Sequence, residues 1–239
     1  MSAGVAGAVP AAPRVVAWDL PTRLFKWSLV ALIALAWVSD KYGGATPGWH
    51  KANGYAVLVL VVFRALWGFF GGASARFSSF APTPRKLAAY LRAARAGRPL
   101  HYLGHNPLGS LMVFALLAIV AAQAVTGLYS GDADRLFIEG PLAATVSDAA
   151  VVTATRAHRF IFDAILVLVA VHVAAVVYYD LVRREGLARA MVTGKKPAAA
   201  YADMAECAPA RPFAALACLA AAAALVFGTI LALGGRAFF

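Results

Sequence analysis

Residues 157–179 read AHRFIFDAILVLVAVHVAAVVYY, a stretch that is long and apolar enough to cross a lipid bilayer as a helix. The stretch nevertheless contains two imidazole side chains, those of His158 and His172. Polar groups inside a bilayer are costly and usually serve a function. Because the two histidines are close to four helical turns apart, we expect both rings on one helix face, about 21 Å apart along the axis.

The composition of the whole chain is that of a membrane protein. Of its 239 residues, 62% are hydrophobic and only 14% are charged, and the mean hydropathy is +0.73, unlike a soluble domain. Five stretches are long and apolar enough to span a bilayer, namely 22–39, 51–71, 108–129, 157–179 and 213–234. We therefore expect an all-α integral membrane protein.

The chain divides into three expected parts. Residues 1–15 lack the pattern of a cleaved signal peptide and are expected to form a disordered N-terminal tail. Residues 16–197 contain the first four spans and form one transmembrane domain. Residues 198–239 contain a linker and the fifth span, which is almost purely alanine and leucine.

The distribution of charge predicts the orientation in the membrane. The 72–107 loop contains six basic residues and no acid, namely Arg76, Arg85, Lys86, Arg92, Arg95 and Arg98. The charged residues between the third and fourth spans are mostly acids, namely Asp132, Asp134, Glu139 and Asp148, against Arg135 and Arg156. Since basic loops stay in the cytoplasm, we expect a cytoplasmic N-terminus, with the 72–107 loop inside and the acidic loop outside. The net charge of +11 then reflects topology and membrane lipid, and no nucleic acid is expected as a partner.

Local signals place two further elements. Asn106 followed by Pro107 is typical of a helix start and would open the third span. The segment PRKLAAYLRAARAGRP, 84–99, is expected to form an amphipathic helix along the cytoplasmic headgroups.

A third histidine lies at a depth that matches one of the first two. His50 opens the second span, at the same outer level that we expect for His158. Two neutral imidazoles that face each other across a helical bundle can take the fifth and sixth positions of a haem iron. The plainer alternative for a single intramembrane histidine is a hydrogen bond between helices. The matched depth favours iron ligation, with His50 and His158 as the outer pair.

His172 needs a partner at the inner level, where the first span offers Lys26. Three alternatives are open. The Lys26 ammonium can extend to the inner headgroups. Its neutral amine can instead bind iron, with burial helping to offset the cost of deprotonation. In the third alternative His105 or His101 supplies the ligand, although His105 also lies where a helix cap is expected.

Two arginines are candidates for binding the carboxylates of a haem, its propionates. Arg64 lies fourteen residues after His50 and so shares its helix face at the inner level. A guanidinium binds a carboxylate through two hydrogen bonds, and the alternative is that Arg64 reaches the headgroups. Arg23 is a second candidate, with a headgroup contact as its alternative.

These features resemble the prokaryotic cytochrome b561 family, which includes the b-type cytochrome subunit of membrane-bound nickel–iron hydrogenases. The resemblance runs from about residue 16 to residue 197. Besides the His158–His172 pair it rests on four stretches in the family's order: AWDLPTRLFKW (17–27), WHKANGYAVLVLVVFRALWGF (49–69), RFSSFAPTPRKLAAYLRA (76–93) and YLGHNPLGSLMV (102–113).

The resemblance implies a four-helix transmembrane bundle that holds two b haems, here with an additional fifth C-terminal transmembrane helix. By position, His50 and His158 resemble the outer-haem ligands, and His172 resembles one inner-haem ligand. The family's first-helix histidine falls on Lys26 in this sequence. The inner haem is therefore ligated by lysine, ligated from elsewhere, or absent.

The resemblance also implies the function. We expect a membrane-bound b-type cytochrome that relays electrons between the quinone pool and a redox partner in a respiratory chain. The partner is either a periplasmic c-type cytochrome, which the acidic loop would attract, or a dehydrogenase or hydrogenase subunit. Some family members oxidise superoxide, so a stand-alone quinone-coupled oxidoreductase is a further option. No residue is expected to be catalytic by itself, and no nicotinamide- or flavin-binding motif is present.

Two other classes of function compete with this one. A small membrane transporter would need a continuous polar path, but the third span offers only Ser110, Gln123 and Thr126. A haem-less anchor subunit is favoured by Lys26 in place of a histidine and is opposed by the intact pair of His50 and His158.

Overall fold

The computed structural model describes residues 13–42, 47–98, 100–131, 139–203 and 211–236. Within these ranges, five helices are long and apolar enough to cross a membrane: α1 (Leu20–Tyr42), α2 (Pro47–Phe70), α5 (Pro107–Tyr129), α6 (Asp148–Leu181) and α8 (Pro212–Ala232). The shorter elements are β1 (Arg14–Val16), α3 (Phe77–Phe80), α4 (Pro84–Arg95), the 3-10 helix η1 (Ala143–Thr145), α7 (Leu187–Thr193) and β2 (Lys195–Pro197). The predicted all-α membrane fold with five spans is confirmed.

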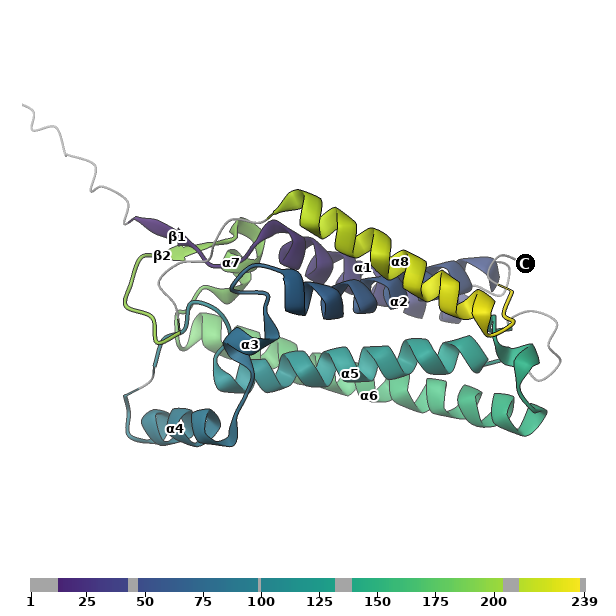
Figure 1. Cartoon of the computed structure of the whole chain (residues 1–239). Helices are drawn as coiled ribbons and strands as arrows, with labels where there is room; N and C mark the ends of the chain where they lie inside the picture. Colours follow the sequence, from purple (N-terminus) through teal and green to yellow (C-terminus); the bar gives the residue numbers. More distant parts are fainter. Residues whose placement is uncertain (1–12, 43–46, 99, 132–138, 204–210, 237–239) are drawn as a thin grey trace, which may run out of the picture.

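Four of the long helices enclose an apolar layer midway along the bundle. Figure 1 shows α5 and α6 side by side, with α1, α2 and α8 together on the other side of the molecule. Buried side chains from α2, α5 and α6 meet between these groups, and leucines of α1 pack against them. The buried residues of this layer are Val57, Val61, Val120 and Ile165.

The fifth long helix, α8, packs on the outside of the four-helix bundle. In Figure 1 it crosses over α1 and α2, and its C-terminal end comes down toward the end of α5. Its buried residues recur at every fourth position, so one narrow stripe of α8 faces the bundle. These residues are Cys218, Ala222, Val226 and Ile230. Their neighbours include Phe63 and Trp67 of α2, so α8 covers α2.

The ends of α5 and α6 follow capping signals. Asn106 caps α5 as predicted, because its Oδ1 accepts the main-chain N–H of Gly109 at 2.7 Å. α6 begins at Asp148, well ahead of the predicted boundary at residue 157. Ser147 caps this earlier start, and the Asp148 carboxylate adds a favourable negative charge to the first turn. Hydropathy alone does not detect such a polar first part of a helix.

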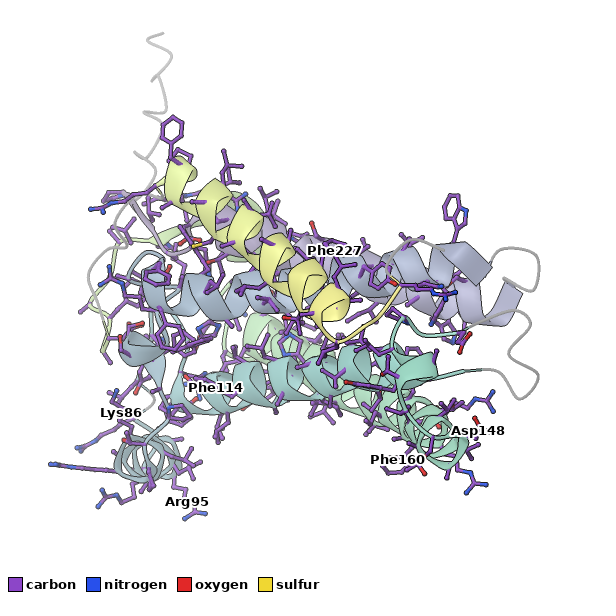
Figure 2. The ribbon with its side chains drawn as sticks, turned by 45° about the vertical axis from the view of Figure 1, so that its right-hand side comes forward. Lys86, Arg95, Phe114, Asp148, Phe160 and Phe227 are labelled. Atoms are coloured by element: carbon purple, nitrogen blue, oxygen red, sulfur yellow. The ribbon has the colours of Figure 1, made fainter. Side chains whose placement is uncertain are left out.

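α4 is the predicted amphipathic helix. Figure 2 looks almost along its axis while the bundle helices run across the view, and Arg95 lies on the side of α4 away from the bundle. Its inward residue Tyr90 is buried, and the Tyr90 hydroxyl lies 2.6 Å from the hydroxyl of Tyr179 near the end of α6. This arrangement suits a helix that lies along lipid headgroups.

A two-stranded antiparallel sheet pairs β1 with β2, with Val15 opposite Lys196. The predicted disordered tail covered residues 1–15. Residues 1–12 lie outside the described residues, whereas residues 14 and 15 belong to β1. The strands are too short for a visible alternating pattern, so no sequence pattern predicts them. The sheet lies with α4 and α7 at one end of the bundle (Figure 1), which we call the basic end.

Candidate functional site

The side chains of His50 and His158 face each other at the end of the bundle opposite the basic end. Their ring centroids are 6.3 Å apart, and the ring planes are inclined at 77°. Two metal–nitrogen bonds of about 2 Å each, plus a ring radius of about 1 Å on each side, would place two axial imidazole centroids about 6 Å apart. The pair is therefore spaced as two imidazoles that share one metal ion would be.

His50 is held by a hydroxyl from the neighbouring helix. Its Nδ1 lies 3.1 Å from Ser39 Oγ on α1. The Ser39 hydroxyl donates its own proton to the main-chain oxygen of Ala36 at 2.9 Å. Ser39 Oγ can then accept a hydrogen bond from the N–H at Nδ1 of His50.

His158 is held in a similar way by α5. Its Nδ1 lies 2.9 Å from the main-chain oxygen of Gln123 and 3.2 Å from Thr126 Oγ1. The side-chain Nε2 of Gln123 lies 3.0 Å from His158 Nε2. A Cβ atom added to Gly127 would lie only 3.0 Å from Cε1 of the same ring. The room for this imidazole therefore depends on Gly127.

A second polar cluster lies at the basic end, beyond the apolar layer. We call it the basic-end cluster, and it contains Lys26, Arg64, His105, His172 and Lys196, which act on one another electrostatically. Lys26 Nζ lies 4.2 Å from the centroid of the Trp18 ring and 3.2 Å from the Met191 sulfur. The Lys26 side chain therefore ends among protein groups, within electrostatic range of His172.

Arg64 is the most deeply buried cation of this cluster. Its side chain is 2% exposed, and its Cζ lies 4.7 Å from the centroid of the Phe77 ring. Among the described residues, none accepts a hydrogen bond from its buried Nη1. A buried guanidinium with an unused N–H donor fits an anionic acceptor. The alternative in which Arg64 reaches the headgroups does not agree with its burial.

Of the two loop histidines, only His105 belongs to the basic-end cluster. Its ring lies 4.6 Å from that of Trp18 and 4.7 Å from that of Phe80, centroid to centroid, and within the described part of the chain its Nδ1 has no partner. Burial and the nearby cations hold the pKa of His105 well below its usual value, so the ring is neutral near pH 7. His101 is instead exposed, with Nδ1 3.8 Å from Glu185.

Arg23 contacts the last turn of α7. Its Nε donates to the main-chain oxygen of Met191 at 3.2 Å, and its Nη2 donates to that of Val192. Positive charge is favourable at this end of a helix. Gly194 follows with a φ of +79°, and a Cβ atom there would lie 2.9 Å from Arg23 Nη1. Arg23 thus joins α1 to α7, and only its remaining donors are open to a ligand.

Sequence reasoning missed most of the surroundings of His50 and His158. Gln123 and Thr126 were noted only as isolated polar residues of the third span, and Ser39 and Gly127 gave no signal. Gln123 and Thr126 are three residues apart and therefore lie on one face of α5, which could have indicated that both contact the same neighbouring side chain. Ser39 and Gly127 could not be found in this way, because their roles depend on how the helices are rotated against each other.

The chain matches known proteins along most of its length. The family model described as prokaryotic cytochrome b561 matches residues 17–194. A protein of Azotobacter vinelandii named "Probable Ni/Fe-hydrogenase B-type cytochrome subunit" is 30% identical over 218 residues, covering 75% of this chain and 87% of the relative. A protein of the same name from Rhizobium leguminosarum bv. viciae is 25% identical over 211 residues, covering 76% and 88%. No solved structure matches the chain.

The family match extends from the start of α1 to the end of α7 and leaves α8 outside it. It includes both polar clusters, the His50–His158 pair and the basic-end cluster, except for Lys196. Together with the membrane-spanning helices, this match shows that the chain belongs to the prokaryotic cytochrome b561 family of membrane-bound b-type cytochromes.

Proposed function

We propose that the chain carries haem b and relays electrons between the quinone pool and a redox partner in the bacterial inner membrane. The observation that carries the proposal is the His50–His158 pair, whose ring centroids are 6.3 Å apart. Haem b would supply a one-electron centre whose potential depends on its ligands and surroundings. We call the site at this pair the outer haem site and the site at the basic end the inner haem site.

At the outer haem site, His50 and His158 would hold the haem iron through their Nε2 atoms. The contacts at Nδ1 of both rings are compatible with this role, because they leave the other nitrogen for iron. The side-chain amide of Gln123 now lies 3.0 Å from His158 Nε2, and it would have to give way to the metal. The main-chain contact of Gln123 at Nδ1 can persist.

At the inner haem site, His172 and Lys26 would be the ligands, with Lys26 binding through a neutral amine. Lys26 and His172 belong to the same basic-end cluster, which supports this pairing. To bind iron, Lys26 Nζ would have to leave the Trp18 ring and the Met191 sulfur that it contacts. His105 is the competing ligand, because its ring is neutral and its Nδ1 has no partner among the described residues.

The propionates of the inner haem would bind to Arg64, whose Nη1 lacks an acceptor among the described residues. Arg23 would add a second contact only through donors that α7 does not use. The buried charge of Arg64 would then be balanced by a carboxylate, which agrees with the general rule for buried cations.

The predicted orientation and the names of the relatives support the choice of partner. Basic loops predict that the basic end is cytoplasmic, which places the outer site toward the periplasm. The relatives are named as hydrogenase subunits, so we favour an oxidoreductase of that kind over a c-type cytochrome as the partner. In the predicted acidic loop, Asp132 and Asp134 lie outside the described residues, whereas Glu139 and Asp148 are described at the outer-site end.

Haem content tests the proposal directly. The full chain would be purified in detergent from haem-sufficient cells, and haem per chain would be measured as the pyridine haemochrome, with reduced-minus-oxidised spectra. We expect a b-type spectrum, and His50→Ala and His158→Ala should each lose one haem. His101→Ala is the matched control, since this histidine is exposed and pairs with Glu185. A colourless wild-type protein, or full haem content in both ligand variants, would refute the proposal.

Substitutions at the inner level decide between the competing ligands. If Lys26 binds iron, Lys26→Ala should lose the inner haem and Lys26→His should keep it with an altered spectrum. If His105 is the ligand, His105→Ala should lose it instead while Lys26→Ala keeps it. A stoichiometry of one haem in the wild type would contradict both alternatives and leave only the outer site.

A further inference from the structure

We infer that Ser39 and Thr126 are positioning residues for the outer haem. Each hydroxyl would hold one axial imidazole as the tautomer that carries its proton on Nδ1, which keeps Nε2 available for iron. The inference rests on the proposed ligation by His50 and His158. It adds two residues that bind no metal themselves but determine how the ligands bind it.

The two hydroxyls occupy equivalent places. Ser39 is on α1 and contacts the histidine of α2, while Thr126 is on α5 and contacts the histidine of α6. Both residues donate their own proton to a main-chain oxygen of their own helix, Ser39 to Ala36 at 2.9 Å and Thr126 to Ala122 or Gln123 at 2.9 Å.

A hydroxyl whose proton is already donated can only accept a further hydrogen bond. The imidazole nitrogen that faces it must therefore carry a proton. A neutral imidazole has one N–H, so its other nitrogen has the free electron pair that a metal ion needs. Both contacts thus select the tautomer that can ligate through Nε2.

The two positions differ in strength. Ser39 is the only hydrogen-bond partner that the described residues offer to His50. His158 Nδ1 has a second acceptor, the main-chain oxygen of Gln123, at the shorter distance of 2.9 Å. Loss of the Ser39 hydroxyl should therefore disturb its ligand more than loss of the Thr126 hydroxyl.

The hydrogen bond at Nδ1 should also affect the redox potential. An acceptor at that proton makes the imidazole a stronger donor to the metal, and a stronger donor stabilises ferric iron over ferrous iron. Removal of the acceptor should raise the midpoint potential of the outer haem. The near-perpendicular ring planes, at 77°, should further give a ferric EPR signal that changes when one ring is free to rotate.

The test compares Ser39→Ala, Thr126→Val and Thr153→Val in the full-length protein. Thr153 is the matched control, because its hydroxyl bonds the main-chain oxygen of Ala149 at 2.8 Å on the exposed side of α6. Haem per chain, the midpoint potential of each haem and the ferric EPR spectrum are measured. We expect an upward shift and a changed EPR signal for Ser39→Ala, a smaller shift for Thr126→Val and none for Thr153→Val.

A conservative variant keeps the test decisive if haem is lost. Ser39→Thr retains a hydroxyl, so it should restore both haem content and potential relative to Ser39→Ala. Equal potentials and EPR spectra in Ser39→Ala and Thr153→Val at full haem content would overturn the inference, as would a Ser39→Thr protein as defective as Ser39→Ala. The underlying ligation fails separately, if His50→Ala and His158→Ala keep the outer haem.

Discussion

Gly127→Ala should weaken haem binding at the outer site without destabilising the helix in which it lies. The new Cβ atom would lie 3.0 Å from Cε1 and 3.4 Å from Nδ1 of His158. Ordinary carbon contacts lie at about 3.5–4.0 Å, so the imidazole would have to move by about 0.5–1 Å. In the haem-free protein the ring can turn aside, but a ring bound to iron cannot.

Two opposing effects set the magnitude. Overpacking at a fixed side chain costs about 1–3 kcal/mol, which corresponds to about 5- to 150-fold weaker haem binding. Replacing glycine by alanine inside a helix stabilises the helix by about 1 kcal/mol. Gly127→Ala should therefore bind haem less tightly, while its haem-free form is at least as stable as the wild type.

Gly228→Ala is the control, because a Cβ atom there meets nothing within 4 Å and gains the same helix propensity. Haem-free protein in detergent would be titrated with haemin, and the affinity for the outer haem compared between the two variants. Thermal unfolding of the haem-free forms would be measured in parallel. Equal haem affinity in Gly127→Ala and Gly228→Ala would refute the reasoning, since the ring would then have room to spare.

Three further predictions concern the basic end. Arg64→Met should lower the inner-haem content of the purified protein and leave the outer haem in place, because methionine lacks the buried N–H donor of Arg64 that would bind a propionate. Reduced-minus-oxidised spectra distinguish the two haems and measure this loss. Asn106→Ala should lower the free energy of unfolding by about 1 kcal/mol through loss of the α5 cap, whereas Asn106→Asp should be nearly neutral in thermal melts. Between pH 7.5 and 5.5 the free energy of unfolding of the wild type should fall as acid is added, by up to about 1.4 kcal/mol per pH unit. In this range His105 takes up a proton in the unfolded chain but not in the folded protein, where its pKa is lowered. His105→Asn should flatten this slope, and an unchanged slope would contradict the role given to burial.

Much of the fold could be predicted from the sequence because the membrane reduces the possibilities. Backbone polar groups must be satisfied within each span, so length and hydropathy suffice to place helices. His50 and His158 were expected at the same depth, and their ring centroids lie 6.3 Å apart. Lys26 and His172 were brought together by the same reasoning, and the structure places them in one cluster.

The remaining features depend on tertiary contacts that have no local signal. The hydroxyls of Ser39 and Thr126 each donate a hydrogen bond to the backbone of their own helix. Other serine and threonine hydroxyls in spanning helices do the same, so the sequence alone does not distinguish Ser39 and Thr126 from them. The early start of α6 depends on the polar cap of Ser147 rather than on hydropathy. β1 and β2 form only because the two ends of the family domain meet at the basic end.

The distance between the two clusters makes substitutions at Lys26 interpretable. His158 and His172 are about 21 Å apart along α6 by helical rise. Two unit charges at that distance interact by about 0.8 kcal/mol at an effective dielectric constant of 20, which corresponds to about 35 mV for one electron. The apolar layer of Val57, Val61 and Ile165 between the clusters offers no chain of polar groups that could carry a larger effect. Lys26→Ala should therefore remove the inner haem in redox titrations while the outer potential changes by no more than about 35 mV. A much larger change would mean that α1 and α6 move together when an inner ligand is lost, and the two sites could then no longer be treated as separate.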